Sequence, residues 1–168
     1  MAGSISRMQF LRGDFKGEIK LLRPPWAIPE ALFIETCSGC GECIKACPAS
    51  ILKPGRAKLP EVDFSGGGCD FCGDCKAVCE TGALSQSAGP GRSPWTLKAH
   101  FEDACLARQG MACYTCQESC DMDAIRLRLV VGGVSAPQLV SDACNGCGDC
   151  YAPCPVGAVS MRPQPAQS

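Results

Sequence analysis

The residues of this chain that could do chemistry are its 16 cysteines, which stand in four groups of four. The first group falls at 37, 40, 43 and 47, and Pro48 follows it directly. Three thiols at intervals of three residues, followed by a fourth, are the spacing by which proteins hold [4Fe–4S] clusters. The first three thiolates bind one cube from a tight loop, and the fourth reaches a different cluster. The spacing therefore indicates iron–sulfur chemistry, which is electron transfer.

The same spacing recurs along the chain. Two further groups repeat its intervals, namely Cys69, Cys72, Cys75, Cys79 and Cys144, Cys147, Cys150, Cys154. In the three regular groups a glycine follows the second cysteine, at Gly41, Gly73 and Gly148. Because glycine has no Cβ and adopts positive φ, it lets the backbone approach a cluster closely.

The remaining group is irregular. Cys105, Cys113, Cys116 and Cys120 keep the last two intervals, but the first interval is longer by five residues. Tyr114 stands where the regular groups have small residues, and Asp121 stands where the first and last groups have proline. We therefore expect this group to hold the least regular cluster, either a labile or a three-iron one.

Composition separates iron–sulfur ligation from two other uses of many cysteines. Aromatic residues make up only 6% of the chain, so an ordinary apolar core cannot fill its centre. A disulfide framework needs an oxidising compartment, and we recognise no cleavable export signal. Structural zinc sites use two C-x₂-C pairs with a long spacer between them, whereas here a third cysteine follows each pair at once. Zinc stays the structural alternative, which the brown colour of an iron–sulfur protein would exclude.

Charge and patterning exclude several function classes. With a net charge of −1 the chain has no basic excess to neutralise phosphates, so we expect no nucleic-acid partner. No apolar run reaches the length of a membrane span. We find no Ser/His/Asp set, phosphate-binding loop or dinucleotide fingerprint, so we do not expect an enzyme. Residues 6–12 resemble a twin-arginine export motif, but charged residues follow it, and we therefore expect a cytoplasmic protein.

Two similar halves are expected to position the four groups. Trp26 precedes Cys37 by 11 residues, Trp95 precedes Cys105 by 10, and each tryptophan follows a proline. We predict an α+β fold: a tandem pair of two-cluster bacterial ferredoxin-like units, with small β-hairpins and short helices around the clusters. The predicted divisions are an N-terminal arm at 1–24, a first unit at 25–85, a linker at 86–93, a second unit at 94–163 and a tail at 164–168.

Local patterns predict the elements of each unit. We expect strands at 31–35, 62–64 and 96–101, a short helix that starts near Cys47, and a turn-rich link at 53–60. Residues 124–130 alternate apolar and polar side chains, which is the period of a half-buried strand. Residues 138–140 are expected to pair with it as a hairpin, and residues 156–161 to close the second unit.

Two-cluster ferredoxins predict how the thiols pair, because each cluster takes three cysteines from one motif and the last from the other. In the first unit the rule gives Cys37, Cys40, Cys43 and Cys79 for cluster 1, and Cys69, Cys72, Cys75 and Cys47 for cluster 2. In the second unit it gives Cys105, Cys113, Cys116 and Cys154 for cluster 3, and Cys144, Cys147, Cys150 and Cys120 for cluster 4.

The chain resembles the NapF family of ferredoxin-type proteins, accessory proteins of the periplasmic nitrate reductase system. The resemblance is carried by S-R-M-Q-F-L-R-G at 6–13, R-P-P-W-A at 23–27, the cysteine groups and the irregular C-L-A-R-Q-G-M-A-C-Y-T-C at 105–116. It implies a cytoplasmic protein with four [4Fe–4S] clusters that binds the catalytic subunit of the reductase before its export.

Two functions follow from this resemblance, and a third is structural. The protein is either a maturation factor that supplies electrons or a cluster to the nitrate reductase precursor, or a general electron-transfer polyferredoxin that serves a respiratory oxidoreductase. The third interpretation is a binding module whose clusters merely hold the fold together.

Overall fold

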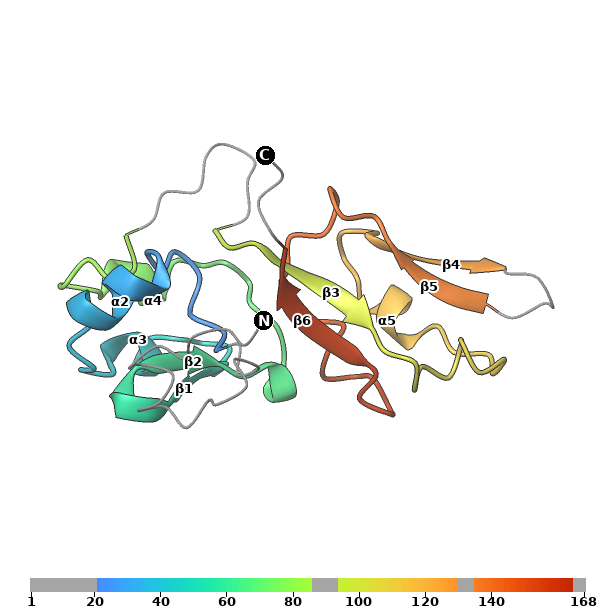
Figure 1. Cartoon of the computed structure of the whole chain (residues 1–168), viewed down its shortest axis with the longest axis horizontal. Coiled ribbons are helices and arrows are strands. Elements are labelled where there is room, and N and C mark those ends of the chain that lie inside the picture. Colours follow the sequence, from blue (N-terminus) through green and yellow to red (C-terminus); the bar gives the residue numbers. More distant parts are fainter. Residues whose placement is uncertain (1–20, 86–93, 130–134, 165–168) are drawn as a thin grey trace, which may run out of the picture.

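The computed structural model describes residues 21–85, 94–129 and 135–164. Almost all of the predicted arm, the whole predicted linker and most of the predicted tail therefore lie outside the described residues. Figure 1 shows short elements in two groups, with residues up to 85 on one side and residues from 94 onward on the other. The first group contains α2 (Glu30–Thr36), α3 (Glu42–Lys45), β1 (Leu52–Pro54), β2 (Pro60–Val62) and α4 (Asp74–Ala77).

The second group contains most of the strands. These elements are β3 (Leu97–Phe101), α5 (Thr115–Glu118), β4 (Ile125–Leu129), β5 (Ser135–Leu139) and β6 (Val159–Pro163). The strands of the described chain form three antiparallel pairs, β1–β2, β3–β6 and β4–β5. In Figure 1 the β3–β6 pair lies between the first group and the β4–β5 hairpin. Short helices and small antiparallel hairpins confirm the predicted fold class.

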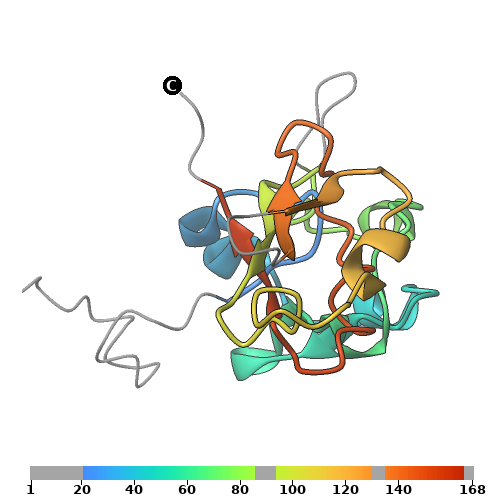
Figure 2. The same cartoon turned by 90° about the vertical axis from the view of Figure 1, so that its right-hand side faces the viewer.

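The hairpin and the strand at 96–101 predicted in the second half are confirmed. Within the predicted strand at 124–130, Ile125–Leu129 forms β4, which pairs with β5 in the register Ile125↔Leu139 and Leu127↔Pro137. The predicted strand at 96–101 is β3, and it pairs with β6 from Leu97↔Pro163 to Phe101↔Val159. Figure 2 shows α5 beside the β4–β5 hairpin at this end of the molecule.

The strand predicted at 31–35 is wrong, because these residues form helix α2. A short apolar run does not by itself distinguish a strand from a buried helical turn. Here Pro29, with φ −49°, precedes the helix, and Glu30 in the first turn suits the positive end of its dipole. The helix buries Phe33 completely, and the Arg23 guanidinium lies 5.1 Å from the centre of that ring.

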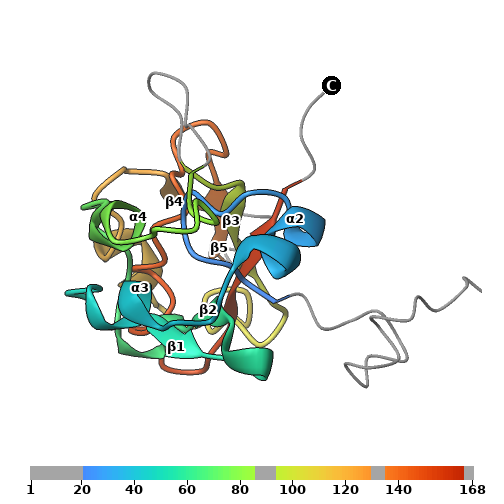
Figure 3. The ribbon, with the colours of Figure 1, turned by 90° about the vertical axis from the view of Figure 1, so that its left-hand side faces the viewer.

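Three predictions between the first and second cysteine groups need correction. The helix expected from Cys47 lies earlier, as α3, so Pro48 is in a turn and not in a first helical position. The turn-rich link contains a hairpin, in which β1 and β2 pair around a 3₁₀ turn at Arg56–Lys58. Of the strand predicted at 62–64, only Val62 belongs to β2, because Phe64 begins a second 3₁₀ turn. Figure 3 shows α3 between α4 and this hairpin.

The apolar core is small and is shared by both halves. Phe33, Ile51 and Phe64 of the first half belong to the same buried cluster as Leu97 and Met161 of the second. The Trp26 N–H also donates to the Pro94 carbonyl at 3.2 Å. The cysteines line the edges of this core, so the packing of apolar side chains and the placement of the thiols depend on each other.

Candidate iron–sulfur centres

Each regular cysteine group of the first half folds around a glycine and one helical turn. Gly41 has φ +79° and directly precedes α3, while Gly73 has φ +86° and directly precedes α4. A residue with a Cβ adopts this left-handed conformation only at a cost, which is why glycine recurs at this point. The helical turn that follows carries the third cysteine, and the fourth cysteine comes after the helix ends. The positive φ predicted for these glycines is confirmed at both positions.

One cavity of the first half brings together thiols from both of its groups. Cys37, Cys40, Cys43 and Cys79 line a cavity of about 150 Å³, and Phe33, Pro60 and Leu84 form apolar parts of its wall. Three of these cysteines belong to the first group, and Cys79 is the last of the second. The cavity thus contains all four members of the predicted cluster 1 set.

The second cavity of this half has the reciprocal composition. It is lined by Cys47, Cys69, Cys72 and Cys75, together with Pro25, Trp26 and Ile51. Cys47 is the last residue of the first group, and the other three thiols come from the second. The four members of the predicted cluster 2 set therefore also lie around one cavity.

The second half repeats this exchange of thiols. One cavity is lined by Cys105, Cys113, Cys116 and Cys154. Another is lined by Cys120, Cys144, Cys147 and Cys150. Each contains three thiols from one group and the last thiol from the other, as in the first half.

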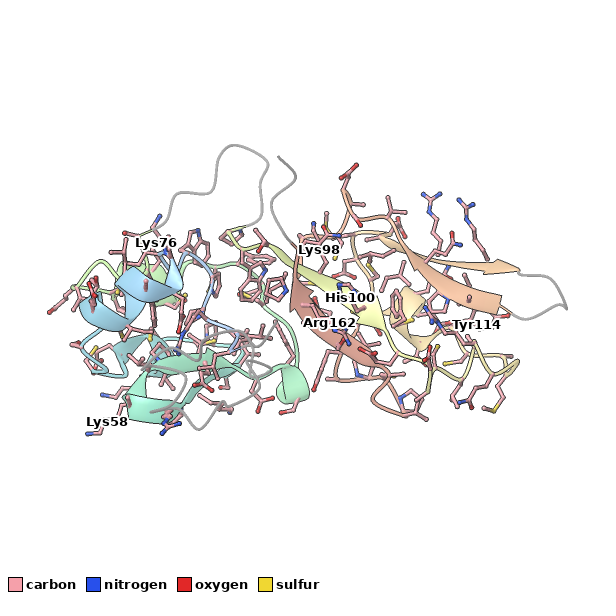
Figure 4. All side chains as sticks on the ribbon, viewed as in Figure 1. Lys58, Lys76, Lys98, His100, Tyr114 and Arg162 are labelled. Carbon is pink, nitrogen blue, oxygen red and sulfur yellow. The ribbon has the colours of Figure 1, made fainter. Side chains whose placement is uncertain are left out.

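The irregular third group reaches its cavity through a compact loop. The Gln109 N–H donates to the carbonyls of Cys105 and Leu106, both at 3.1 Å, and the Met111 N–H donates to Leu106 at 3.0 Å. These bonds fold the long interval back on itself, so Cys105 lines the same cavity as Cys113 and Cys116. Tyr114 has φ −122°, unlike the glycines at the equivalent positions, and its side chain is 51% exposed. Figure 4 shows Tyr114 at the end of the second half that lies away from the first.

In the first half, thiols that line one cavity raise each other's pKa. Burial raises the pKa of the Cys43 thiol to about 11, with further contributions from Cys37, Cys40 and Cys79. These are the three other thiols of the same cavity. Burial likewise raises the pKa of Cys75 to about 12, helped by the charges of Cys69 and other nearby thiols.

The second half shows the same electrostatics. Burial raises the pKa of Cys116 to about 11, and the charges of Cys105, Cys113 and Cys154 add to the effect. Burial, followed by the charge of Cys144, raises the pKa of Cys150 to about 12. Four thiolates in one poorly solvated cavity repel each other unless a cationic group lies between them. A bound metal centre supplies that charge and keeps the thiols deprotonated.

The spread of the thiols around each cavity fits a cluster. Four thiols line the wall of each cavity, three from one group and one from the other. A [4Fe–4S] cluster is held by four thiolates that bind separate irons around a cube. Thiols distributed over the wall of a cavity meet that requirement.

Comparison with known proteins agrees with this geometry. The 4Fe-4S dicluster domain family matches residues 36–84 and 110–159. The chain is 39% identical over 157 residues to the ferredoxin-type protein NapF of Escherichia coli (strain K12), which covers 94% of each chain. It is 38% identical over 169 residues to NapF of Haemophilus influenzae, covering 95% of this chain and 94% of the other. The chain belongs to the NapF family of ferredoxin-type proteins.

NapF-like proteins are not the only ferredoxin-type proteins that this chain resembles. It is 32% identical over 177 residues to the methylamine utilization ferredoxin-type protein MauM of Methylorubrum extorquens, covering 94% of this chain and 79% of the other. The two dicluster matches fall inside the units predicted at 25–85 and 94–163. As a NapF-family protein with two dicluster domains and 16 cysteines, the chain carries four [4Fe–4S] clusters. None of the helices in the described ranges could cross a membrane.

Hydrogen bonds to sulfur form a feature that the sequence analysis missed. The Ala158 N–H donates to the Cys154 thiol at 3.2 Å, and the Ala124 N–H donates to Cys120 at 3.4 Å. The Thr81 hydroxyl lies 3.7 Å from the Cys79 sulfur. Hydrogen bonds to the ligand sulfurs tune the reduction potential of a cluster. The sequence does carry a signal for these hydrogen bonds. An alanine stands four residues after the last cysteine of a group, or a threonine stands two residues after it.

A lysine holds the loop that leads into the fourth group. Lys98 on β3 donates from Nζ to the Ser141 carbonyl at 2.8 Å and also to the Cys144 carbonyl. Its side chain lies at the β3–β6 pair (Figure 4). Strand β3 thereby fixes the start of the loop that carries Cys144.

The thiols of the two halves differ in exposure. Cys40 and Cys72 are exposed, whereas each cysteine of the second half is buried or only partly exposed. Within the first half each cavity therefore has one thiol that a partner in solution can approach.

Proposed function

We propose that this protein is an iron–sulfur accessory factor that acts on the cytoplasmic precursor of the periplasmic nitrate reductase catalytic subunit. It supplies that precursor with electrons or with an assembled [4Fe–4S] cluster before export. The observation that supports this function is the set of four cavities, each lined by four thiols, in a chain similar to NapF over nearly its whole length.

We also propose the ligand sets that these cavities suggest. Cluster 1 is bound by Cys37, Cys40, Cys43 and Cys79, and cluster 2 by Cys47, Cys69, Cys72 and Cys75. Cluster 3 is bound by Cys105, Cys113, Cys116 and Cys154, and cluster 4 by Cys120, Cys144, Cys147 and Cys150. The exchanged last cysteines connect the two motifs of each half, so binding a cluster also stabilises the half around it.

Residues around the cavities exclude water, hold a sulfur in place and leave one thiol accessible. A bound cluster supplies reversible one-electron chemistry. Phe33 and Leu84 keep water from one side of the first cavity. The Ala158 N–H holds the Cys154 sulfur in place. Cys40, which is exposed, leaves the first cavity accessible to a partner.

Deletion of the gene tests the proposal. We expect the exported reductase to lose activity even when an artificial donor supplies its electrons, because the enzyme itself is incompletely matured. The wild-type gene should restore that activity, and a Cys43→Ser gene should not. If the reductase is fully active with the artificial donor and only physiological electron flow is lost, the maturation role is wrong.

Capture of the partner is an independent test. Val62 N–H donates to the Leu22 carbonyl at 2.8 Å, so a chain that begins at residue 21 keeps the described packing. We expect the full chain to retain the nitrate reductase precursor, and the chain without residues 1–20 to retain less if the N-terminal arm takes part in binding. Failure of both chains to bind the precursor would contradict the proposed partner.

A general electron-transfer polyferredoxin is the second candidate function. The similarity to MauM favours it, since that relative belongs by its name to methylamine utilization. In this case the protein passes electrons to a respiratory oxidoreductase and leaves its assembly unaffected. The artificial-donor assay separates the two candidates, because a pure carrier leaves the reductase fully active with that donor.

A further inference from the structure

The two halves touch through residues that belong to two different cysteine groups. The Cys69 N–H donates to the Cys147 carbonyl at 2.8 Å. Cys69 lines the second cavity of the first half, and Cys147 lines the cavity of the fourth group in the second half. A single backbone hydrogen bond therefore joins the walls of two cavities that the dicluster pattern assigns to separate units.

Two glycines make this approach possible. A Cβ on Gly68 would lie 2.2 Å from the Asp149 Oδ1 atom and 2.8 Å from the Asp149 backbone nitrogen. A Cβ on Gly148 would lie 2.3 Å from the Phe64 ring. No side chain fits at either position unless the neighbouring half moves away. We call the contact of residues 64–69 with residues 145–149 the inter-half seam.

Aromatic side chains cover the seam. Phe64 is 3% exposed, and its ring centroid lies 5.8 Å from Trp95 and 6.2 Å from Tyr151. Phe71 lies 5.7 Å from Trp95 on another side. The Trp95 Nε1–H donates to the Asn145 carbonyl at 3.3 Å, which fixes the ring on the loop before Cys147. These rings, drawn from both halves, pack against each other at the contact.

The helices place the remaining two cavities beside this pair, and we call the cavities of Cys69 and Cys147 inner and the other two outer. Cys43 of the first cavity lies on α3, which contacts α4, the helix that carries Cys75 of the second cavity. In the second half, Cys116 lines the outer cavity, and Cys120, four residues later, lines the inner one. Each inner cavity thus neighbours an outer one within its own half, and the seam joins the two inner cavities.

We propose that the four clusters form one electron path through the whole molecule, with the Cys69–Cys147 hydrogen bond as the junction between the halves. This inference rests on the ligand sets proposed above. With clusters bound, Cys69 and Cys147 would hold the two inner ones on either side of the seam, and one electron would pass from the reduced cluster, which is oxidised, to the oxidised cluster, which is reduced. No bond to protein changes and no proton is transferred. The electron would come from a low-potential one-electron donor, which this path requires, and its acceptor would be the partner protein.

The substitution Gly68→Ala tests the junction, and Gly66→Ala is its matched control. A Cβ at Gly66 meets no atom within 4 Å, and neither glycine has a positive φ, so the two changes differ only in the clash with Asp149. Both holoproteins are reduced with dithionite, and the magnetic interaction between clusters is measured by electron paramagnetic resonance. We expect Gly66→Ala to match the wild type. We expect Gly68→Ala to lose the part of the interaction that arises between the halves while it keeps the iron and sulfide of the wild type.

An unchanged spectrum in Gly68→Ala, together with faster exchange of the Cys69 amide hydrogen, would overturn the proposal. If Gly68→Ala binds less iron, Phe64→Leu replaces it, because that change removes the ring against Gly148 without touching a cysteine loop. The wild-type protein also gives a direct result: the Cys69 amide must exchange slowly, and rapid exchange would show that the junction is open. Iron content and capture of the reductase precursor are measured separately, so failure of the proposed function is distinguishable from failure of the junction.

Discussion

At the scale of single residues, the thiols of each cavity compete with protons for iron. Burial raises the pKa of Cys43 and Cys116 to about 11 and that of Cys75 and Cys150 to about 12. A cavity that has lost its iron while the rest of the fold is kept therefore holds its thiols protonated well above neutral pH. Iron binding must displace that proton, so the affinity for iron depends on pH.

The sign of this dependence follows from the raised pKa values. As the pH falls, proton binding to the free thiols becomes more favourable relative to iron binding, so we expect the holoprotein to lose iron to a chelator faster. Iron release is measured anaerobically between about pH 9 and about pH 6 at a fixed chelator concentration. A release rate that does not change over this range would contradict proton competition at the thiols.

The exchange of last cysteines between groups is also testable at the residue scale. Because Cys79 lines the same cavity as Cys40, Cys40→Ser and Cys79→Ser should each remove the same cluster, about four iron atoms. The double substitution should then remove no more iron than either single one. Pairing Cys40→Ser with Cys47→Ser should remove about twice as much, because Cys47 lines the other cavity. If the double variant lost as much iron as the sum of the losses in Cys40→Ser and Cys79→Ser, the proposed ligand sets would be wrong.

At the scale of elements, the sequence predicted strands better than helices. The alternation at 124–130 predicted β4 correctly, because one face of a half-buried strand carries the apolar side chains. The run at 31–35 has no such alternation, and Pro29 and Glu30 started a helix instead. Helix α3 has four residues, so no periodicity could reveal it. The helix starts after Gly41, which has a left-handed backbone. The cysteine spacing predicts a glycine with this conformation, whereas helix propensity does not.

Substitution of this glycine tests the element it begins. Gly41 has φ +79° and nothing within 4 Å of an added Cβ, so Gly41→Ala introduces backbone strain without a steric clash. We expect a loss of about 1–2 kcal/mol in stability, seen as a lower melting temperature of the holoprotein. Gly41→Asn should lose less, because asparagine tolerates the left-handed region. Gly66→Ala is the control, and an effect as large as that of Gly41→Ala would contradict the role assigned to positive φ.

At the scale of the whole molecule, the halves are less separate than their sequences suggested. The duplicated pattern predicted two units with a linker, and the thiols of each predicted set do line one cavity. The shared core and the inter-half seam could not be predicted in this way, because Gly68 and Gly148 have no apolar signal. Their importance lies in the side chain that is missing, which only the packed structure shows.

The fold of the whole molecule depends on its bound metal centres. The apolar core is small, and four groups of thiols surround spaces that side chains do not fill. When the binding energy of a metal centre supplies the stability of a domain, removal of the metal unfolds it. We expect anaerobic chelation to abolish most secondary structure, as measured by far-ultraviolet circular dichroism. A metal-free chain with near-native helix and strand signals would contradict this dependence.

The count of iron and acid-labile sulfide in anaerobically purified protein tests the central claim most directly. Four [4Fe–4S] clusters require about 16 iron atoms and about 16 sulfides per chain, with a brown colour that bleaches reversibly on reduction. A colourless protein that binds zinc, or one whose thiols have formed disulfides, would contradict the whole account.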